Sequence, residues 1–185
     1  GIQRSRDVFD TNAAGSAFHC KTHKVDYIRG EALLEKAGEV AVRLAEGKTE
    51  AHQAEKFLVS TGVVPRPMPG FPFDGKKVIG SREAMILEPQ PKSMVIIGAG
   101  AIGVEFAYFY NAFGTAVTLI EMLPNILPVE DTEVSRTLEK ALKKQGINIL
   151  TNSKTTKTEL TKNGVAITVE GKTAETIEAD VCLVA

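Results

Sequence analysis

The sequence predicts an α/β protein whose second half is built on a parallel sheet. Two observations carry this prediction. From residue 93 onward, apolar runs typical of buried strands alternate with helical stretches, which is the order found in parallel α/β sheets. Three glycines spaced as G-x-G-x-x-G, namely Gly98, Gly100 and Gly103, join the first apolar run to the first helix of that region. The fold class we expect is therefore Rossmann-like.

Five elements of this domain can be placed in order. They are a strand at 93–97, a helix at 101–113, a strand at 116–122, a helix at 132–145 and a strand at 147–150. The second helix is well marked, because Asp131 can cap its start and Gly146 can end it in the left-handed region. Val134, Leu138 and Leu142 lie on one face of this helix.

The first part of the chain is predicted as a helix followed by short strands. The helix is expected at residues 4–24, and the strands at 25–29, 39–44 and 56–62. A turn at Glu46 and Gly47 separates the last two strands. These short runs predict a small antiparallel meander.

A proline-rich segment marks the expected domain boundary. Four of the eight prolines fall between residues 65 and 75, which is too many for a helix or a central strand. We place the boundary near Pro69, which gives two domains, residues 1–68 and residues 69–185.

The glycine motif predicts a turn that binds phosphate. Gly98 permits a sharp turn, Gly100 lets the backbone approach a pyrophosphate, and Gly103 lets the helix pack closely on the strand. Anionic phosphates then meet the unpaired N–H groups at the helix start. The alternative is a tight α/β turn without a ligand. The candidate dinucleotide loop comprises Gly98, Ala99, Gly100, Ala101, Ile102, Gly103, Val104 and Glu105.

Glu121 ends the second apolar run, 18 residues after Gly103. A carboxylate at this point accepts hydrogen bonds from ribose hydroxyls and repels a 2′-phosphate. Met122, Leu123 and Pro124 follow it, with no arginine to bind such a phosphate. The pattern therefore favours NAD over NADP, and the alternative is an ordinary strand-end acid in solvent.

Composition argues against several kinds of partner. The net charge of −1 provides no basic surface for nucleic acid. Apolar stretches stop well short of the roughly 20 residues that span a membrane, and the N-terminus lacks the apolar core of a signal peptide. We expect a cytoplasmic protein.

Cysteine and histidine residues give no sign of a reactive centre. Cys20 and Cys182 lie too far apart for a short-spaced redox or zinc motif, so two reduced structural thiols are expected. His19, His23 and His52 fall at a predicted helix end and in a meander loop, where solvated side chains without a catalytic or metal role are expected.

The chain also resembles itself. Residues 147–185 repeat the layout of residues 25–60, with a strand, an irregular link, a hairpin arm, an identical E-G-K-T turn and a final apolar strand. In this alignment Ser60 falls opposite Ala185. Such repeats indicate duplicated architecture. The first 62 residues are therefore expected to be the back half of another dinucleotide-binding domain, whose own glycine loop would precede Gly1.

Three segments carry a resemblance to a known family: "STGVVPRPMPGFPFDG", the long stretch from "MVIIGAGAIGVEF" to "KALKKQGI", and the closing "ADVCLVA". The chain resembles the pyridine nucleotide–disulfide oxidoreductases, most closely the dihydrolipoamide dehydrogenases. The resemblance implies electron transfer from a dihydrolipoyl group through a redox-active cysteine pair and FAD to NAD. It also implies a homodimer that works with the lipoyl-bearing acyltransferase of a 2-oxo acid dehydrogenase complex.

The resemblance assigns roles to individual residues. Thr61 and Gly62 match a flavin-contacting motif, in which Ser60 replaces the usual alanine, and Ala32 matches a position near the flavin adenine. Residues 1–68 would thus be the C-terminal part of an FAD-binding domain. Thr155 matches a position near the NAD adenine. Glu105 matches an acid at the nicotinamide–flavin contact, or is an acid favoured by the helix dipole.

The family's reactive groups have no counterpart in this sequence. It contains neither a C-x-x-x-x-C pair nor an H-x-x-x-x-E pair. We therefore expect an internal fragment that holds a cofactor clamp and is inactive by itself. Alternatives are a sibling flavoprotein, such as a mercuric reductase, transhydrogenase or NADH oxidase, and a non-catalytic NAD-sensing module.

Overall fold

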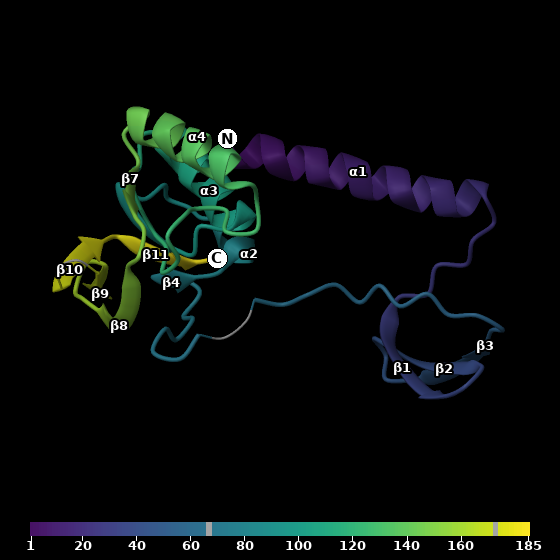
Figure 1. Cartoon of the computed structure of the whole chain (residues 1–185). Coiled ribbons are helices and arrows are strands. Elements are labelled where there is room, and N and C mark those ends of the chain that lie inside the picture. The colour runs from purple at the N-terminus through teal and green to yellow at the C-terminus, as the bar shows by residue number, and fades with distance from the viewer. Residues whose placement is uncertain (66–67, 172–173) are drawn as a thin grey trace. The chain divides into compact units, whose positions relative to one another are not determined.

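A computed structural model describes residues 1–65, 68–171 and 174–185 (Figure 1). The chain divides into an N-terminal unit, Gly1–Val63, and a C-terminal unit, Val64–Ala185. The division falls a few residues before Pro69, just ahead of the proline-rich stretch.

The N-terminal unit contains one helix and one small sheet. Helix α1 spans Ile2–Thr22, and all its residues are exposed or half-buried. Strands β1 (Gly30–Lys36), β2 (Glu39–Leu44) and β3 (Thr49–Gln53) pair in order as an antiparallel meander. Gly47, with φ of +85°, makes the turn between β2 and β3. The predicted helix, the strand at 39–44 and the meander are thus present.

Two strands predicted in this unit are wrong. Residues 25–29 and 56–62 lie in irregular chain, although both are apolar. The strands that flank β2 are instead β1 and β3, which are more polar. An apolar run forms a strand only where a neighbouring strand can accept its backbone hydrogen bonds. Here the hairpin turns bring the polar segments beside β2.

The C-terminal unit is built on a five-stranded parallel sheet in the order β4-β11-β5-β6-β7. Its fold is Rossmann-like, as predicted. Its strands are β4 (Val78–Ile79), β5 (Ser93–Ile97), β6 (Ala116–Ile120), β7 (Asn148–Leu150) and β11 (Val181–Val184). Its helices are α2 (Ser81–Ala84), α3 (Ala101–Ala112) and α4 (Thr132–Lys144). Between β7 and β11, a second antiparallel meander comprises β8 (Lys154–Leu160), β9 (Val165–Glu170) and β10 (Ala174–Ala179). The strand predicted at 116–122 ends at Ile120, which leaves Glu121 just beyond it.

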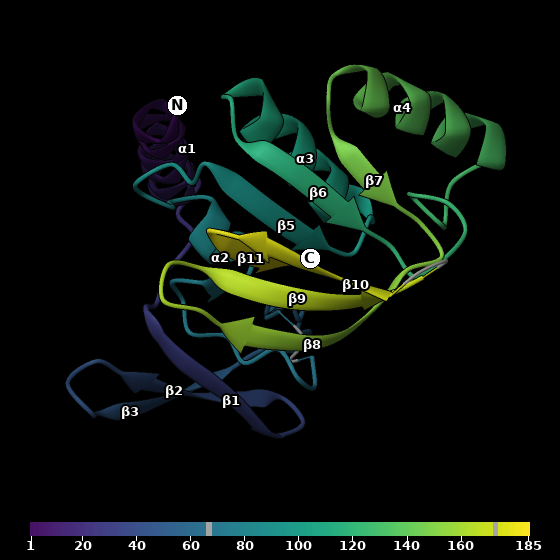
Figure 2. The same cartoon turned by 90° about the vertical axis from the view of Figure 1, so that its left-hand side faces the viewer.

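Alternate residues of the parallel strands pack into two separate hydrophobic cores, one on each face of the sheet. Met94 and Ile96 of β5 face helices α3 and α4, where they pack with Val104 and Leu142. Val95 and Ile97 face the opposite side, where they pack against Val165, Ile167 and Val169 of β9. Figure 2 shows the resulting three layers, with α3 and α4 on one face of the sheet and the β8–β9–β10 meander on the other. This arrangement fixes the carboxyl ends of the strands between two packed layers.

Helix α4 follows the predicted start and end signals. The carboxylate of Asp131 accepts hydrogen bonds from the N–H groups of Glu133 (2.8 Å) and Val134 (3.4 Å), which caps the helix. Gly146, with φ of +96°, follows the helix in the left-handed region. Leu138 and Leu142 of the apolar face pack in the core. Val134 is 55% exposed, and Ser135 is the buried residue of that turn.

Two broader features concern the described residues as a whole. Across residues 1–65, 68–171 and 174–185, no helix is long and apolar enough to cross a membrane. Within the same ranges, no three His, Cys, Asp or Glu side chains are grouped so that they could hold a metal ion. The second E-G-K-T turn includes residues 172 and 173, which lie outside the described ranges.

Candidate dinucleotide site

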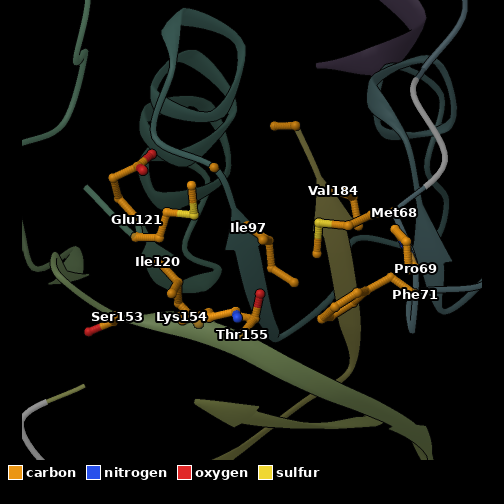
Figure 3. A pocket seen from close by; sticks show the side chains of 13 residues that line it. Met68, Pro69, Phe71, Ile97, Ile120, Glu121, Ser153, Lys154, Thr155 and Val184 are labelled. Carbon is orange, nitrogen blue, oxygen red and sulfur yellow. The ribbon is translucent and has the colours of Figure 1, made fainter. Parts of the chain in front are cut away.

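A cavity of about 360 Å³ lies at the carboxyl ends of β5, β6 and β11. Ligands of open α/β sheets bind at this edge, because connections leave the sheet in different directions there. Figure 3 shows Glu121 on the opposite side of the cavity from Met68, Pro69 and Phe71. The lining residues are Met68, Pro69, Phe71, Ile97, Gly98, Ile120, Glu121, Met122, Ser153, Lys154, Thr155, Val184 and Ala185.

The three motif glycines differ in what surrounds them. Gly98 has a φ of +99°, and an added Cβ would lie 2.5 Å from the carbonyl oxygen of Ala185. At Gly103 an added Cβ would lie 1.9 Å from the carbonyl oxygen of Gly98, so only glycine lets α3 pack this closely. At Gly100, no described heavy atom outside its neighbours lies within 4 Å of an added Cβ. Two glycines are thus required by the fold, and the third leaves open space.

The start of α3 contrasts with the start of α4. The N-cap residue of α3 is Gly100, which has no side chain to accept hydrogen bonds from the first turn. The first turn, from Ala101 to Val104, also carries no acid. Helix α4 satisfies its own first N–H groups through Asp131. The N–H groups and positive dipole end of α3 therefore remain available to an anion.

Glu121 is a buried acid with four defined backbone and side-chain contacts. Its residue is 8% exposed. Oε2 accepts a hydrogen bond from the N–H of Ala99 at 2.8 Å, and Oε1 accepts one from the N–H of Leu123 at 2.9 Å. Its own N–H donates to the carbonyl of Leu150 (2.8 Å), and its carbonyl accepts from Ser153 (3.0 Å). The carboxylate is thus held beside the glycine turn.

The other predicted site residues fall in different places. Thr155, at the start of β8, is half-buried and lines the cavity with Gly98 and Glu121. Glu105 is exposed in the second turn of α3. Ala32 on β1 and the irregular residues Thr61 and Gly62 are exposed in the N-terminal unit. Three exposed positions do not define a flavin cavity, so their flavin role stays a prediction.

Sequence patterns missed part of the cavity wall. Met68 and Phe71 belong to the proline-rich stretch, where they form an isolated antiparallel bridge, and Phe71 is fully packed in the core beneath β9. Ser153, in the turn between β7 and β8, and Lys154, the first residue of β8, also line the cavity. The segment "GFPF" around Phe71 could have indicated a buried anchor, because two aromatic residues interrupt an otherwise polar or proline-rich run.

Several titratable groups lie outside the cavity. Burial raises the pKa of the Cys182 thiol to about 12, so this thiol is unreactive at neutral pH. Burial also raises the pKa of Tyr110 to about 12, and its hydroxyl donates to the carbonyl of Ala84 at 2.6 Å. His19 and His23 on and just after α1 are exposed, with ring centroids 6.2 Å apart. His52 lies on β3, not in a loop as predicted, with Nε2 3.7 Å from the carboxylate of Glu50.

Comparison with known proteins gives a consistent family match. The family described as pyridine nucleotide-disulphide oxidoreductase matches residues 3–185. A dihydrolipoyl dehydrogenase of Chlorobaculum tepidum is 40% identical over 186 residues, which cover 100% of this chain and 40% of that protein. A dihydrolipoamide dehydrogenase of Chaetomium thermophilum is 40% identical over 175 residues, covering 92% of this chain and 35% of that protein.

Solved structures agree with the sequence relatives. LpdA from Mycobacterium tuberculosis superimposes with a TM-score of 0.88 at 25% identity, covering 100% of this chain and 41% of that one. The HOCl-induced flavoprotein disulfide reductase RclA from Escherichia coli gives a TM-score of 0.82 at 28% identity, with 100% and 41% covered. The chain therefore spans about 40% of the length of the relatives that it matches.

Proposed function

The chain belongs to the pyridine nucleotide-disulphide oxidoreductase family, and on this premise we propose that residues 69–185 are the NAD-binding domain of a flavoprotein oxidoreductase. Residues 1–68 are proposed to be part of its FAD-binding domain. Members of this family use FAD and NAD. The proposed reaction of the whole protein carries electrons from dihydrolipoamide through a redox disulfide and FAD to NAD. Its proposed partners are a second copy and a lipoyl-bearing acyltransferase of a 2-oxo acid dehydrogenase complex.

One observation carries the NAD proposal, namely the uncapped start of α3 beside an acid-lined cavity. The open space at Gly100 suits close approach of a pyrophosphate. Gly98 and Glu121 line the same cavity at the carboxyl edge of the sheet. The donors for an anion and the acceptor for ribose hydroxyls thus lie side by side, which fits the adenosine and pyrophosphate portion of the dinucleotide.

The chain's own residues would bind and orient the nucleotide. The N–H groups at the start of α3 would hold the pyrophosphate, Glu121 would accept ribose hydroxyl hydrogen bonds, and Thr155 would lie near the adenine. Glu105, exposed on the second turn of α3, would lie toward the nicotinamide end. When bound, NAD supplies a hydride acceptor. A second nucleotide, NADP, would place its 2′-phosphate against the carboxylate of Glu121 and bind more weakly.

The role of Glu121 in choosing between the nucleotides can be tested by titration. Charge-assisted hydrogen bonds contribute roughly 1.5–3 kcal/mol each before desolvation costs. Glu121→Ala should therefore weaken NAD about 10- to 100-fold and narrow the preference over NADP, because repulsion of the 2′-phosphate is also removed. The measurement is calorimetric titration of both proteins with both nucleotides. An unchanged ratio of the two dissociation constants would make Glu121 an ordinary strand-end acid.

The role of the glycine turn can be tested without disturbing the fold. Gly100 has a φ of −70°, which alanine adopts readily. Gly100→Ala should keep the melting temperature within a few degrees and weaken NAD by about tenfold or more, because the methyl group enters the pyrophosphate position. Gly15→Ala, on exposed α1 with open space around it, is the matched control. NAD affinity that survives Gly100→Ala would contradict the proposed position of the pyrophosphate.

The activity of the whole protein is proposed to be absent from residues 1–185 alone. The cysteine pair, the flavin phosphate loop and the acid/base pair have no counterpart in this sequence. Purified 1–185 should therefore not reduce NAD with dihydrolipoamide and should not retain one flavin per chain. Either result, measured by absorbance, would contradict this part of the proposal.

A second candidate is a flavoprotein disulfide reductase acting on another substrate. The similarity to RclA, at 28% identity over the whole of this chain, supports this second candidate. The two candidates differ in the substrate that reduces or oxidises the disulfide. Steady-state assays of the full-length protein with dihydrolipoamide and with oxidants such as hypochlorite would separate them.

A further inference from the structure

A continuous path of hydrogen bonds runs through the glycine turn. The carboxylate of Glu121 accepts the N–H of Ala99 at 2.8 Å. The carbonyl of Ala99 accepts the N–H of Leu127 at 2.7 Å, and the carbonyl of Leu127 accepts the hydroxyl of Ser135 at 3.2 Å. This path, which we name the turn clamp, joins the end of β6, the glycine turn, the loop after β6 and helix α4.

Each member of the turn clamp occupies a position that needs a specific explanation. Glu121 and Ser135 are two of the few buried polar residues of the described chain, at 8% and 1% exposure. Leu127 has a φ of +46°, a conformation that costs a side chain such as leucine about 1–2 kcal/mol. Ile126 beside it is fully buried and holds the loop in place. Surrounding structure therefore enforces the direction of the Leu127 N–H and carbonyl groups.

Ala99 is the point at which this enforcement matters. It lies between Gly98 and Gly100, so its peptide groups have unusual rotational freedom. In the structure both its N–H and its carbonyl are engaged by the turn clamp. The hydrogen bonds thereby remove a freedom that the flanking glycines would otherwise allow.

We infer that the turn clamp fixes the glycine turn in its binding conformation before any dinucleotide arrives, with Glu121 and Ser135 as positioning residues. The inference rests on the proposed NAD site and deepens it. An ionised carboxylate has about four acceptor positions. Two are taken by Ala99 and Leu123, which leaves others for ribose hydroxyls. Glu121 thus shapes the turn and, in the same orientation, presents its free lone pairs.

Two consequences separate this inference from a simple ribose-binding role. Removal of Glu121 loosens the turn, so it weakens NAD and NADP by a common factor in addition to changing their ratio. Removal of the Ser135 hydroxyl affects both nucleotides equally, although Ser135 is not part of the cavity wall. A residue that only stabilised the fold would not change the affinity of the folded protein.

The decisive experiment compares two buried hydroxyl groups of the C-terminal unit. Ser135→Ala removes the last link of the turn clamp. Thr115→Val is the matched control, because Thr115 is 1% exposed and donates to the carbonyl of Pro91 at 2.8 Å, at the amino end of β6. Amide hydrogen exchange is followed by NMR without nucleotide, and the dissociation constants of NAD and NADP are measured on the folded proteins.

The expected results are specific to the turn. Loss of one hydrogen bond is worth roughly two- to tenfold in an equilibrium constant. Ser135→Ala should raise exchange at the Leu127 and Ala99 amides by about this factor and weaken both nucleotides by a similar factor. Thr115→Val should lower thermal stability but leave these amides and both affinities unchanged.

Several outcomes would overturn the inference. Wild-type exchange at Ala99 and Leu127 in Ser135→Ala would do so, as would an equal effect of Thr115→Val on both nucleotides. Should Ser135→Ala fail to fold, Glu121→Gln decides, since its amide group can accept only one of the two N–H donors and should release Ala99 or Leu123. If neither the wild type nor any variant binds NAD, the proposed function is contradicted. The exchange data would still decide whether the turn clamp exists.

Discussion

Residues 25–60 and residues 147–185 contain the same order of segments, but the two copies differ in outcome. In the second copy, the β8–β9–β10 meander is flanked by β7 and β11, and both of these strands belong to the five-stranded sheet. In the first copy, the β1–β2–β3 meander is also formed, but the flanking segments at 25–29 and 56–60 are irregular. The meander is therefore self-sufficient and the flanking strands are not.

The difference between the two copies is clearest at one pair of aligned leucines. With Ser60 opposite Ala185, Leu58 lies opposite Leu183; Leu58 is 94% exposed and Leu183 is fully buried. Strand β11 has a parallel partner on each side, β4 and β5. A parallel strand depends on neighbours supplied by distant parts of the chain, whereas an antiparallel hairpin brings its own. An apolar sequence can therefore form a central strand only where neighbouring strands are present to pair with it.

The largest expected difference between the copies is in hydrogen exchange. Amides of β11 should exchange only through opening of the whole C-terminal unit, which for a domain of this kind costs about 5–15 kcal/mol. Amides of residues 56–60 should exchange within a few orders of magnitude of an unfolded chain. Mass spectrometry of peptides from the purified chain measures both. Equally slow exchange in the two segments would mean that the first copy is ordered in solution.

Thiol chemistry gives the next largest contrast. In the alignment of the two copies, Cys182 of β11 corresponds to Phe57, which is 39% exposed. Since burial raises the pKa of Cys182 to about 12, it should carry roughly a thousandfold less thiolate at pH 8 than an ordinary cysteine. In a Cys20→Ser background, Phe57→Cys should react with Ellman's reagent at a model-thiol rate and Cys182 only on unfolding. Comparable rates at both positions would contradict the contrast.

Alanine at the aligned leucines should separate the copies by stability. Leu183→Ala should lower the free energy of unfolding by about 2–5 kcal/mol, because it leaves a cavity in the core under α3. Leu58→Ala should change it by less than about 0.5 kcal/mol, because its side chain is in solvent. Urea titration of both variants provides the measurement. A cost of several kcal/mol for Leu58→Ala would show that residues 56–60 pack in solution.

The same reasoning explains which elements could be predicted. Strand β5 and helix α4 carry complete local signals, such as an apolar run of strand length or the Asp131 cap, and their predicted positions agree with the structure. The strands at 25–29 and 56–62 were predicted from apolar runs alone and are wrong, because pairing is not a local property. Val134 is exposed although Leu142 on the same apolar face is buried, because Val134 lies at the edge of that face, and periodicity alone cannot decide how far the burial extends.

The site was predictable where one residue type has one geometric use. Gly98 and Gly103 stand where any side chain would collide with backbone oxygen atoms. Glu121 was expected at the carboxyl edge and lies there, but its hydrogen bonds to Ala99 and Leu123 depend on a loop conformation that has no sequence signature. Met68 and Phe71 reach the cavity only because the proline-rich stretch folds back onto β9. Whether these residues bind NAD stays a prediction.

The carboxylate of Asp74 supports β4, one of the two strands that pair with β11. Oδ1 of Asp74 accepts hydrogen bonds from the N–H groups of Lys76 (2.8 Å), Lys77 (2.7 Å) and Val78 (2.9 Å), and Val78 begins β4. Burial acts to raise the pKa of Asp74, but the hydrogen bonds from Lys76, Val78 and Lys77 outweigh it and hold the pKa below its ordinary value. Asp74 lies outside both copies and reaches the second one only through β4, which pairs with β11.

The smallest expected effect is a pH dependence of the five-stranded sheet that contains β11 of the second copy. Because the folded state lowers the pKa of Asp74, its ionised form stabilises β4 above the ordinary pKa near 4, and this contribution is lost as the pH falls through the lowered folded value. Asp74→Asn should lower the free energy of unfolding by at most about 1 kcal/mol at pH 7, because solvent screens this exposed group. The loss should be smaller at pH 3, because there the unfolded chain already binds a proton at this carboxylate and the ionised form contributes less to stability. Asp26→Asn, in the exposed segment of the first copy, is the control and should leave the free energy of unfolding unchanged at pH 7 and at pH 3. Urea titrations at pH 7 and pH 3 test this, and a difference between wild type and Asp74→Asn that does not shrink at pH 3 would show that the charge of Asp74 does not support the strand beside β11.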